Sequence, residues 1–436
     1  AGFPAKFAAG VEAAASTGGQ LMPPVMGAGA FIMASYTQIP YVDIIAIAAL
    51  PALLYFLSVG FFVRVEAMRS HAHAVETDTR PLGEVFKDGW HYLLPLVVLV
   101  ALLIYGFTPT YAAGFSIISV VAASWLSKHP MGFRDVLDAL AQGSKNMATT
   151  SMLLISVGLV VNVVAMTGIG NTFSLMVTDW AGGSLMITIV LVALASLILG
   201  MGLPVTASYI VLATLSAPAL YGLIAESQLL NMIVTGSLPE AAHSIFMLVD
   251  MEKAALLTAP MSEADAQQLL SLVPADFKHQ LLEMALDPSA LAMALLSAHM
   301  IIFWLSQDSN VTPPVCLTAF AAAAIAKTPP MATGFTAWKV AKGLYIVPLL
   351  FAYTPFIGGD WAEVLSIFAF ACVGIYALVG FMEGYLESRL NIALRLLCGV
   401  LGVVLLWPHG MLVVNLAAAT LFIALFIYNR KQVKPA

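Results

Sequence analysis

The sequence predicts an all-α integral membrane protein, built as a polytopic bundle of helices. Hydrophobic residues make up 61% of the 436 residues, charged residues only 10%, and the mean hydropathy is +0.93. Soluble domains carry about 25% charged residues. Apolar stretches whose lengths approach the roughly 20 residues needed to span a bilayer recur along the chain. The alternation of apolar and polar residues that is typical of a membrane barrel is absent from the sequence. The predicted apolar stretches are 41–63, 91–106, 110–126, 148–168, 185–222, 291–326, 342–357, 361–380, 393–407 and 411–428.

The first apolar region is interrupted at residues 15–25, which read ASTGGQLMPPV, before it continues to Ala34. Proline lacks an amide hydrogen and breaks the helix ladder, so nearby carbonyls and amides lose their partners. In hydrocarbon such backbone persists only where it is buried in protein or lines a polar cavity. The segment therefore predicts a broken helix whose open peptide groups face a binding site.

Lysine and arginine residues collect in four places and predict the sidedness, because they favour the cytoplasmic side. With all four inside, the first broken helix runs outward and residues 185–222 form a hairpin entered from outside. Charged and apolar residues mix around Arg134–Lys145 and Met382–Leu394, which we expect to be helices along the membrane surface, with ordinary loops as the alternative. The four groups are Arg64, Arg69, Arg80 and Lys87; Lys128, Arg134 and Lys145; Lys327, Lys339 and Lys342; and Arg430, Lys431 and Lys434.

The tip of the predicted hairpin, residues 200–208, reads GMGLPVTAS. It places two glycines, a proline and two hydroxyl residues between apolar arms, which is the chemistry of the broken helix again. A simple turn between two helices is the alternative.

Residues 223–290 differ from the rest of the chain. They contain nine acidic residues, and only Lys253 and Lys278 as cations. The predicted topology places them outside, and the scarcity of lysine and arginine agrees. We expect a small extracytoplasmic helical insert, with a solvated loop of no specific role as the alternative.

A second interruption at residues 306–315 reads SQDSNVTPPV and is followed by an apolar run through Ala326. It repeats the Pro-Pro pattern of the first and, in the predicted topology, runs inward. Interrupted helices at matching places in two halves, with opposite directions, are the sequence mark of a transporter binding site. The alternative is a pair of proline kinks at helix contacts packed with small residues.

The interrupted segments carry the chemistry of cation and carboxylate binding. Unwound backbone supplies carbonyl oxygens, hydroxyls add more, and glycines let a ligand approach the backbone. The half-helices after Pro24 and Pro314 present free amides and a positive dipole end, suited to a carboxylate. Asp308 is the acid within these segments; a role at a cation or proton and a role as a helix cap at a water-filled mouth stay open.

Other residues exclude several classes of function. The histidines His91, His243, His299 and His409 are isolated from one another, and no cysteine or histidine spacing suggests a transition-metal site. We therefore expect no cofactor and no enzymatic activity. The net charge of −6 and the lack of a large basic cluster argue against a nucleic-acid partner.

The segments EAAASTGGQ at 12–20 and PPVMGA at 23–28 resemble the membrane permeases of TRAP transporters, in the TAXI-type branch with fused small and large subunits. GMGLPVTA at 200–207, TPPV at 312–315, TGFTA at 333–337 and IVP at 346–348 match further segments of that family in order. The resemblance covers most of the chain.

This resemblance implies cation-coupled uptake of organic acids, driven by sodium or else by protons, and delivery by a periplasmic TAXI-type binding protein. It implies an elevator mechanism and a place in the bacterial or archaeal cytoplasmic membrane. Together with the residue chemistry it gives two sets of candidates. The ion-binding candidates are Ser16, Thr17, Gly18, Gly19, Gly200, Gly202, Thr206 and Thr312. The substrate-binding candidates are Gln20, Pro23, Pro24, Ser208, Ser309, Asn310, Pro313 and Pro314.

The sequence departs from the family pattern in two respects. The first hairpin and the small-subunit helices are expected upstream of Ala1, so we interpret the chain as truncated at its N-terminus. The insert is also longer than the pattern. The predicted units are 1–222, the first part of the permease with its hairpin at 185–222; 223–290, the insert; 291–357, the second broken helix and the next span; and 361–436, the C-terminal helices and tail.

Three other hypotheses remain open at this point. A one-component anion/sodium symporter of related architecture would need no binding protein. An integral membrane enzyme would need clustered histidines or acids on facing helices. A non-transporting fragment would follow from truncation.

Overall fold

The computed structural model describes residues 2–70, 81–127, 130–201, 203–249, 257, 259–407 and 412–432. Across these ranges the regular elements are helices, and one isolated bridge joins Tyr385 and Arg389. The predicted all-α class is confirmed.

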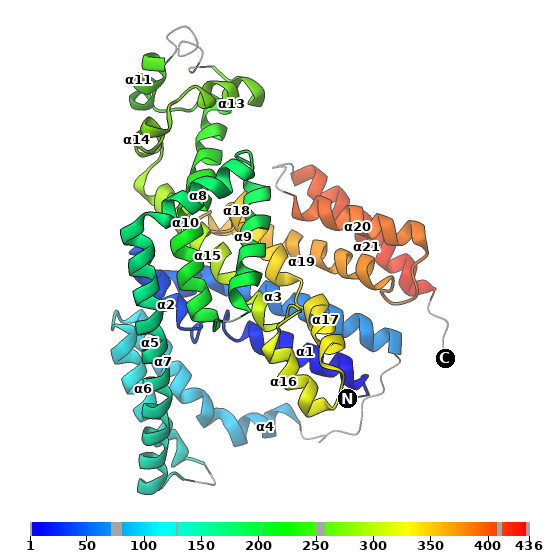
Figure 1. Ribbon diagram of the computed structural model, residues 1–436. Coiled ribbons are helices and arrows are strands. Elements are labelled where there is room, and N and C mark those ends of the chain that lie inside the picture. The colour runs from blue at the N-terminus through cyan, green and yellow to red at the C-terminus, as the bar shows by residue number, and fades with distance from the viewer. Residues whose placement is uncertain are drawn as a thin grey trace.

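Helices follow one another along the described chain and are labelled in Figure 1. The elements up to residue 235 are α1 (Ala5–Gly18), α2 (Gly29–Thr37), α3 (Tyr41–Ser70), α4 (Leu82–Gly89), the 3-10 turn η1 (Trp90–Leu93), α5 (Leu94–Ile104), α6 (Pro109–Ser124), α7 (Phe133–Thr167), α8 (Ile169–Trp180), α9 (Leu185–Gly200) and α10 (Val205–Thr235). The later elements are α11 (Glu240–Val249), α13 (Glu263–Ser271), α14 (Ala275–Ala285), α15 (Pro288–Leu305), the 3-10 turn η3 (Asp308–Asn310), α16 (Leu317–Ala326), α17 (Pro330–Val340), α18 (Gly343–Tyr353), α19 (Trp361–Glu383), α20 (Ile392–Leu406) and α21 (Leu412–Lys431).

Within the described residues, eight helical stretches are long and apolar enough to cross a membrane. Shorter apolar helices accompany them, as expected for a fold with interrupted spans. The protein is therefore a multi-pass membrane protein. The eight stretches are Tyr41–Ser70, Gly83–Ile104, Phe133–Thr167, Val205–Thr235, Pro288–Asn310, Pro330–Tyr353, Trp361–Glu383 and Leu412–Lys431.

Both predicted broken helices are present, and they run antiparallel. The first consists of α1 and α2 with the break between them, and the second of α15, η3 and α16. Helix α1 packs against α16, and α2 packs against α15. The first half of each broken helix thus lies beside the second half of the other, so the two breaks meet at one level of the bundle.

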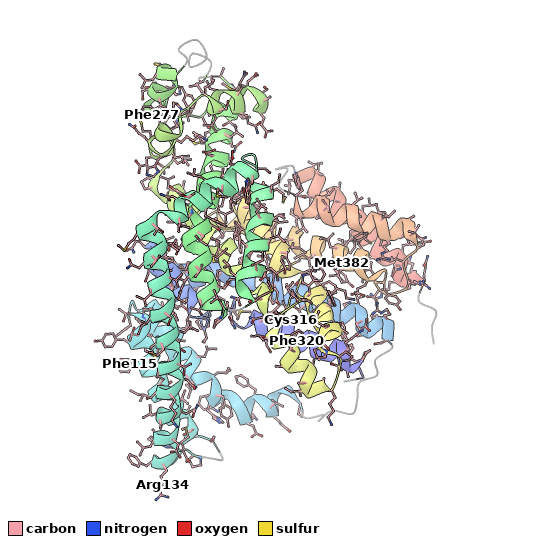
Figure 2. The ribbon with its side chains drawn as sticks, in the orientation of Figure 1. Phe115, Arg134, Phe277, Cys316, Phe320 and Met382 are labelled. Carbon is pink, nitrogen blue, oxygen red and sulfur yellow. The ribbon has the colours of Figure 1, made fainter. Side chains whose placement is uncertain are left out.

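Helix α7 corrects the prediction for Arg134–Lys145. These residues are not a separate surface helix but the first part of a single 35-residue helix that continues through Thr167. No proline lies between Met131 and Thr167, and once a helix is nucleated polar residues do not stop it. Arg134 lies near the tip of α7, at the opposite end of the molecule from Phe277 of the insert (Figure 2).

The hairpin formed by α9 and α10 is longer than predicted. Helix α10 does not end near residue 222 but continues to Thr235, where Gly236 takes a positive φ of 67°. Glycine adopts this conformation without the clash that a side chain would cause, which ends the helix. The described residues of this segment after Thr235 include the helices α11, α13 and α14, and Lys278 of α14 pairs with Glu226 of α10 at 2.9 Å.

The C-terminal helices correct the prediction for Met382–Leu394. This segment is a tight connection between antiparallel α19 and α20 and not a surface helix. Gly384 ends α19 with a φ of 64°, and the Asn391 side chain caps α20 by accepting a bond from the Leu394 amide at 2.8 Å. Ion pairs from Arg64 to Glu387 and from Arg69 to Glu383 join this end to α3.

Candidate functional site

The second break is a buried turn between α15 and α16. After Leu305 the chain makes the short 3-10 turn η3, in which Asp308 and Ser309 are buried. The Thr312 amide donates to the Asp308 carbonyl at 2.8 Å, and the Pro313–Pro314 peptide bond is cis. The turn thus satisfies part of the backbone that the prolines remove from the helix ladder.

The first break is a loop between α1 and α2. The Gly27 amide donates to the Gln20 carbonyl at 2.9 Å and closes the loop, and its Pro23–Pro24 bond is also cis. The Tyr41 hydroxyl donates to the Pro24 carbonyl at 2.8 Å, which anchors the loop to α3.

The tip of the α9–α10 hairpin lies directly on the second break. A Cβ added to Gly200 would collide with the Cβ of Ser309, so only glycine permits this approach. One turn earlier, the Ser196 hydroxyl donates to the carbonyl of Leu305 at 2.9 Å. The hairpin and the second broken helix are therefore fitted together at their centres.

A cavity of about 480 Å³ lies where the hairpin tip and the two breaks meet. This volume is within the range of roughly 300–1,000 Å³ that is usual for small-ligand sites. Among the described residues its lining mixes amide, hydroxyl and apolar groups and contains no charged side chain. The lining residues are Gln20, Gly200, Met201, Leu203, Pro204, Val205, Thr206, Asn310 and Leu317.

Two helix N-termini face this cavity. Val205 and Thr206 begin α10, and Leu317 begins α16; all three residues line the space. Neither helix has a side-chain cap on its first amides. Free amides and the positive end of a helix dipole favour an anion, so the cavity can bind a carboxylate without a lysine or arginine.

The sequence profile described as "Tripartite ATP-independent periplasmic transporter, DctM component" matches residues 1–357, the part of the chain that contains both broken helices and the hairpin. The chain belongs to the DctM family. Searches of curated proteins and of solved structures returned no match. DctM components are transporter subunits that work with a periplasmic substrate-binding protein and a small membrane subunit. This confirms the resemblance to a TRAP permease, and the chain is the large component of such a transporter.

Four of the predicted site residues of this DctM component line the cavity: Gln20, Gly200, Thr206 and Asn310. They come from the first break, the hairpin and the second break, so the fold gathers residues that are far apart in the sequence. Gly202 lies outside the described residues.

Three predicted hydroxyl residues, Thr17, Thr312 and Ser208, do not reach the cavity. Thr17 is buried and donates to the carbonyl of Ala13 at 2.9 Å, within its own helix. The Thr312 hydroxyl pairs with that of Tyr345 at 2.8 Å. Ser208 is fully buried one turn inside α10, and its hydroxyl has no hydrogen-bond partner among the described residues. None of the three lines the cavity.

The remaining candidates lie around the cavity without lining it. Gly18 serves helix packing, because an added Cβ would lie 2.5 Å from the ring of Tyr55. Ser16 and Gly19 are exposed at the end of α1, and the Ser16 hydroxyl lies 3.4 Å from Glu12 Oε1. The others are Ser309, under the hairpin tip, and the proline pairs Pro23, Pro24, Pro313 and Pro314, within the two loops.

Sequence analysis missed the tyrosines that hold the breaks. The Tyr55 hydroxyl donates to the Ala14 carbonyl at 2.7 Å beside the first break, and Tyr345 pairs with Thr312 beside the second. Each tyrosine lies in an ordinary apolar span, so only the position of Tyr345 just before the IVP segment could have drawn attention to it.

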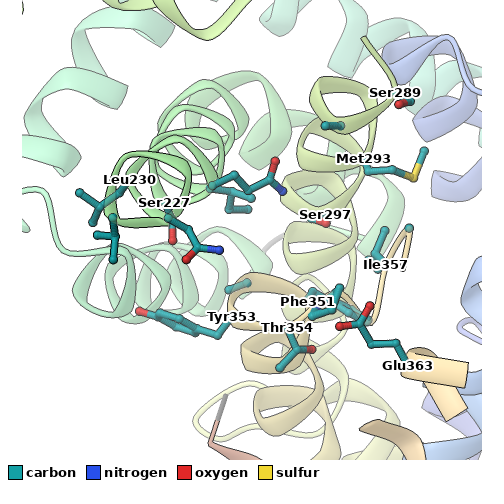
Figure 3. Close-up of a pocket in the computed structure, with 18 of the residues that line it drawn as sticks. Ser227, Leu230, Ser289, Met293, Ser297, Phe351, Tyr353, Thr354, Ile357 and Glu363 are labelled. Atoms are coloured by element: carbon teal, nitrogen blue, oxygen red, sulfur yellow. The ribbon is translucent and has the colours of Figure 1, made fainter. Parts of the chain in front are cut away.

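A larger cavity of about 910 Å³ lies elsewhere, between α10, α15 and the end of α18 (Figure 3). Ser227 of α10, Ser297 of α15 and Thr354 after α18 lie around it, with Glu363 at one edge. No predicted site residue lines this space, and neither break reaches it. The smaller cavity is therefore the candidate transport site, because it joins all three interrupted elements.

Proposed function

We propose that this permease takes up organic acids and that a cation gradient drives the uptake. We propose also that the 480 Å³ cavity binds the substrate carboxylate. The observation that carries this proposal is the meeting of Gln20, Thr206 and Asn310 with the uncapped starts of α10 and α16. Amide and hydroxyl donors together with two helix dipoles offset the cost of removing a carboxylate from water. The apolar part of the lining suits the carbon skeleton of such an acid.

Cation coupling is proposed from the oxygen-rich interrupted backbone next to this cavity. Open carbonyls and hydroxyls at broken helices suit a hard cation, and we take sodium as the coupling ion, with the proton as the alternative. The interlocked hairpin and second break suit an elevator mechanism, in which the elements around the cavity move as one body against the other helices.

The partner and the membrane follow from the same proposal. A TAXI-type binding protein would deliver the substrate on the side of the insert, in the cytoplasmic membrane of a bacterium or an archaeon. The position of the insert opposite the α7 tip with Arg134 supports this sidedness, because lysine and arginine favour the cytoplasmic side (Figure 2).

The test compares two asparagines in the complete transporter, reconstituted in proteoliposomes with its binding protein. Asn310→Leu removes amide donors from the transport cavity, whereas Asn231→Leu makes the same change at the larger cavity. A hydrogen bond to a charged group is worth about 1.5–3 kcal/mol. We therefore expect Asn310→Leu to reduce kcat/KM for uptake about tenfold or more, and Asn231→Leu to leave it unchanged.

The same preparation tests the competing hypotheses. Uptake is measured with sodium and pH gradients imposed separately, and with the binding protein omitted. Uptake that needs no binding protein would favour the one-component symporter. Equal activity of Asn310→Leu and the unaltered protein would exclude this cavity as the substrate site.

A further inference from the structure

Helices α19, α20 and α21 follow the segment 1–357 that the DctM profile matches, so membership of the family does not say what they do. The three helices pack on one another and form one unit. The Asn429 side chain of α21 closes this unit, because its Oδ1 accepts bonds from the amides of Glu387 at 3.0 Å and Ser388 at 2.9 Å, in the connection between α19 and α20. We call α19, α20 and α21 the C-terminal unit.

The C-terminal unit is attached to the rest of the protein by ion pairs. Arg69 of α3 pairs with Glu383 Oε2 at the end of α19, at 2.9 Å, and Lys339 of α17 lies 2.6 Å from Glu383 Oε1. Arg64 of α3 pairs with Glu387 in the next connection. The side chains of Glu383 and Glu387 are only 4% and 6% exposed. Breaking a buried ion pair leaves an uncompensated charge, so these contacts resist separation.

Helices α3 and α17, which carry these cations, are fixed to the broken helices. The Tyr55 hydroxyl of α3 donates to the Ala14 carbonyl of α1 at 2.7 Å, and the Tyr41 hydroxyl donates to the Pro24 carbonyl of the first break at 2.8 Å. Helix α17 packs against α1 and α16. The ion pairs therefore connect the C-terminal unit to elements of both broken helices.

Helices α5, α6 and α7 lie on the opposite side of the molecule from the C-terminal unit (Figure 1). Helices α5 and α6 pack mainly on each other and on η1, and α7 contacts α8 and α10. Over the full described length of α7, Val157 is the buried residue. Such limited packing suits a boundary along which the neighbouring elements slide.

We propose that the C-terminal unit is a permanent part of the moving body, and that it travels with the broken helices and the hairpin during transport. This inference rests on the proposed elevator mechanism and adds which further helices travel. The ion pairs of Glu383 and Glu387 then stay intact throughout the transport cycle. The boundary that shifts lies on the side of α5, α6 and α7.

The experiment measures distances between pairs of spin labels by double electron–electron resonance, in the complete transporter in lipid nanodiscs. The labels are attached to introduced cysteines, in a variant that lacks the three native cysteines and keeps uptake. Three exposed positions are used: Phe335 on α17, Leu396 on α20 and Leu159 on α7. Distances are recorded in sodium chloride, in the chloride of a large organic cation, and at acidic and alkaline pH, each with and without the binding protein.

We expect the Phe335–Leu396 distance distribution to be the same in all conditions, whereas the distances from Leu159 to both other positions shift together. If Leu396 keeps its distance to Leu159 and changes its distance to Phe335, the C-terminal unit belongs to the stationary body. The inference is then wrong, while the elevator mechanism stands. If all three distances change, the unit moves by itself and the inference is also wrong. If all three stay constant, the elevator mechanism fails and the inference fails with it.

A matched pair of variants tests the ion pairs. Glu383→Gln removes the charge that Arg69 and Lys339 share. Glu363→Gln makes the same change at the exposed start of α19, where the described residues provide no ion pair. We expect Glu383→Gln to lower Tm and to broaden the distance distribution between the labels on α17 and α20, and Glu363→Gln to change neither. An unchanged Tm and a narrow distribution in Glu383→Gln would show that these ion pairs do not hold the C-terminal unit on the moving body.

Discussion

At the first break, Ser16, Gly19 and Val25 are exposed, and one tyrosine anchors the loop through the Pro24 carbonyl. At the second break, Gln307 and Asp308 are almost fully buried and the hairpin tip covers the turn. Both breaks come from a similar pattern of hydroxyl, amide and Pro-Pro residues. The comparison teaches that the pattern creates open backbone, whereas the tertiary neighbours decide whether that backbone is open to a ligand or enclosed by protein.

The largest effect is expected where the hairpin meets the second break. Gly200→Ala places a methyl group in the volume of the Ser309 side chain, and overpacking of this kind costs about 1–3 kcal/mol. We expect uptake to fall by at least about tenfold and Tm to decrease, because the shift moves the cavity lining. Gly60→Ala in α3 is the control, since no atom lies within 4 Å of the added Cβ. Full uptake by Gly200→Ala would show that the tip is free to move away from the break.

An intermediate effect is expected at the hydroxyl pair of the second break. Thr312→Val removes the bond to Tyr345 and should lower the free energy of unfolding by about 1 kcal/mol. Tyr345→Phe removes the same bond. Chemical denaturation of both variants and of the double variant should give non-additive changes, because the pair is lost only once. Additive changes would mean that the two hydroxyls act separately.

The smallest effect is expected at the corresponding threonine of the first break. Thr17 bonds only to Ala13 of its own helix, so Thr17→Val should change the free energy of unfolding by no more than about 0.5 kcal/mol. Sodium-dependent uptake should remain close to that of the unaltered protein. A loss of sodium dependence in proteoliposomes would place the Thr17 hydroxyl on the ion after all and remove the distinction between the two breaks.

The helical class, both interruptions and the hairpin tip could be predicted from the sequence, because proline, glycine and long apolar runs act through local backbone chemistry. The ends of long helices were harder to predict from the sequence. The continuity of α7 through Lys145 and the extension of α10 to Thr235 depend on the lack of a strong stop signal, which composition does not reveal.

The binding site could be predicted only in part, and the physical reason differs from the one that applies to the helix ends. The sequence places Gln20, Thr206 and Asn310 in interrupted segments, and the structure brings them to one cavity. Whether a hydroxyl faces that cavity depends on partners distant in the chain. The Thr312 hydroxyl is hydrogen-bonded to the Tyr345 hydroxyl and does not line the cavity. No local sequence pattern around Thr312 predicts that contact.

The contact between Gly200 and Ser309 also limits how this protein can vary over evolutionary time. The missing side chain at one position leaves the room that the hydroxymethyl group occupies at the other. A side chain at residue 200 requires a smaller residue at 309, and a bulkier residue at 309 cannot gain room at 200, which is already glycine. Two segments encoded far apart in the gene are thus under a shared steric constraint, and neither can drift alone.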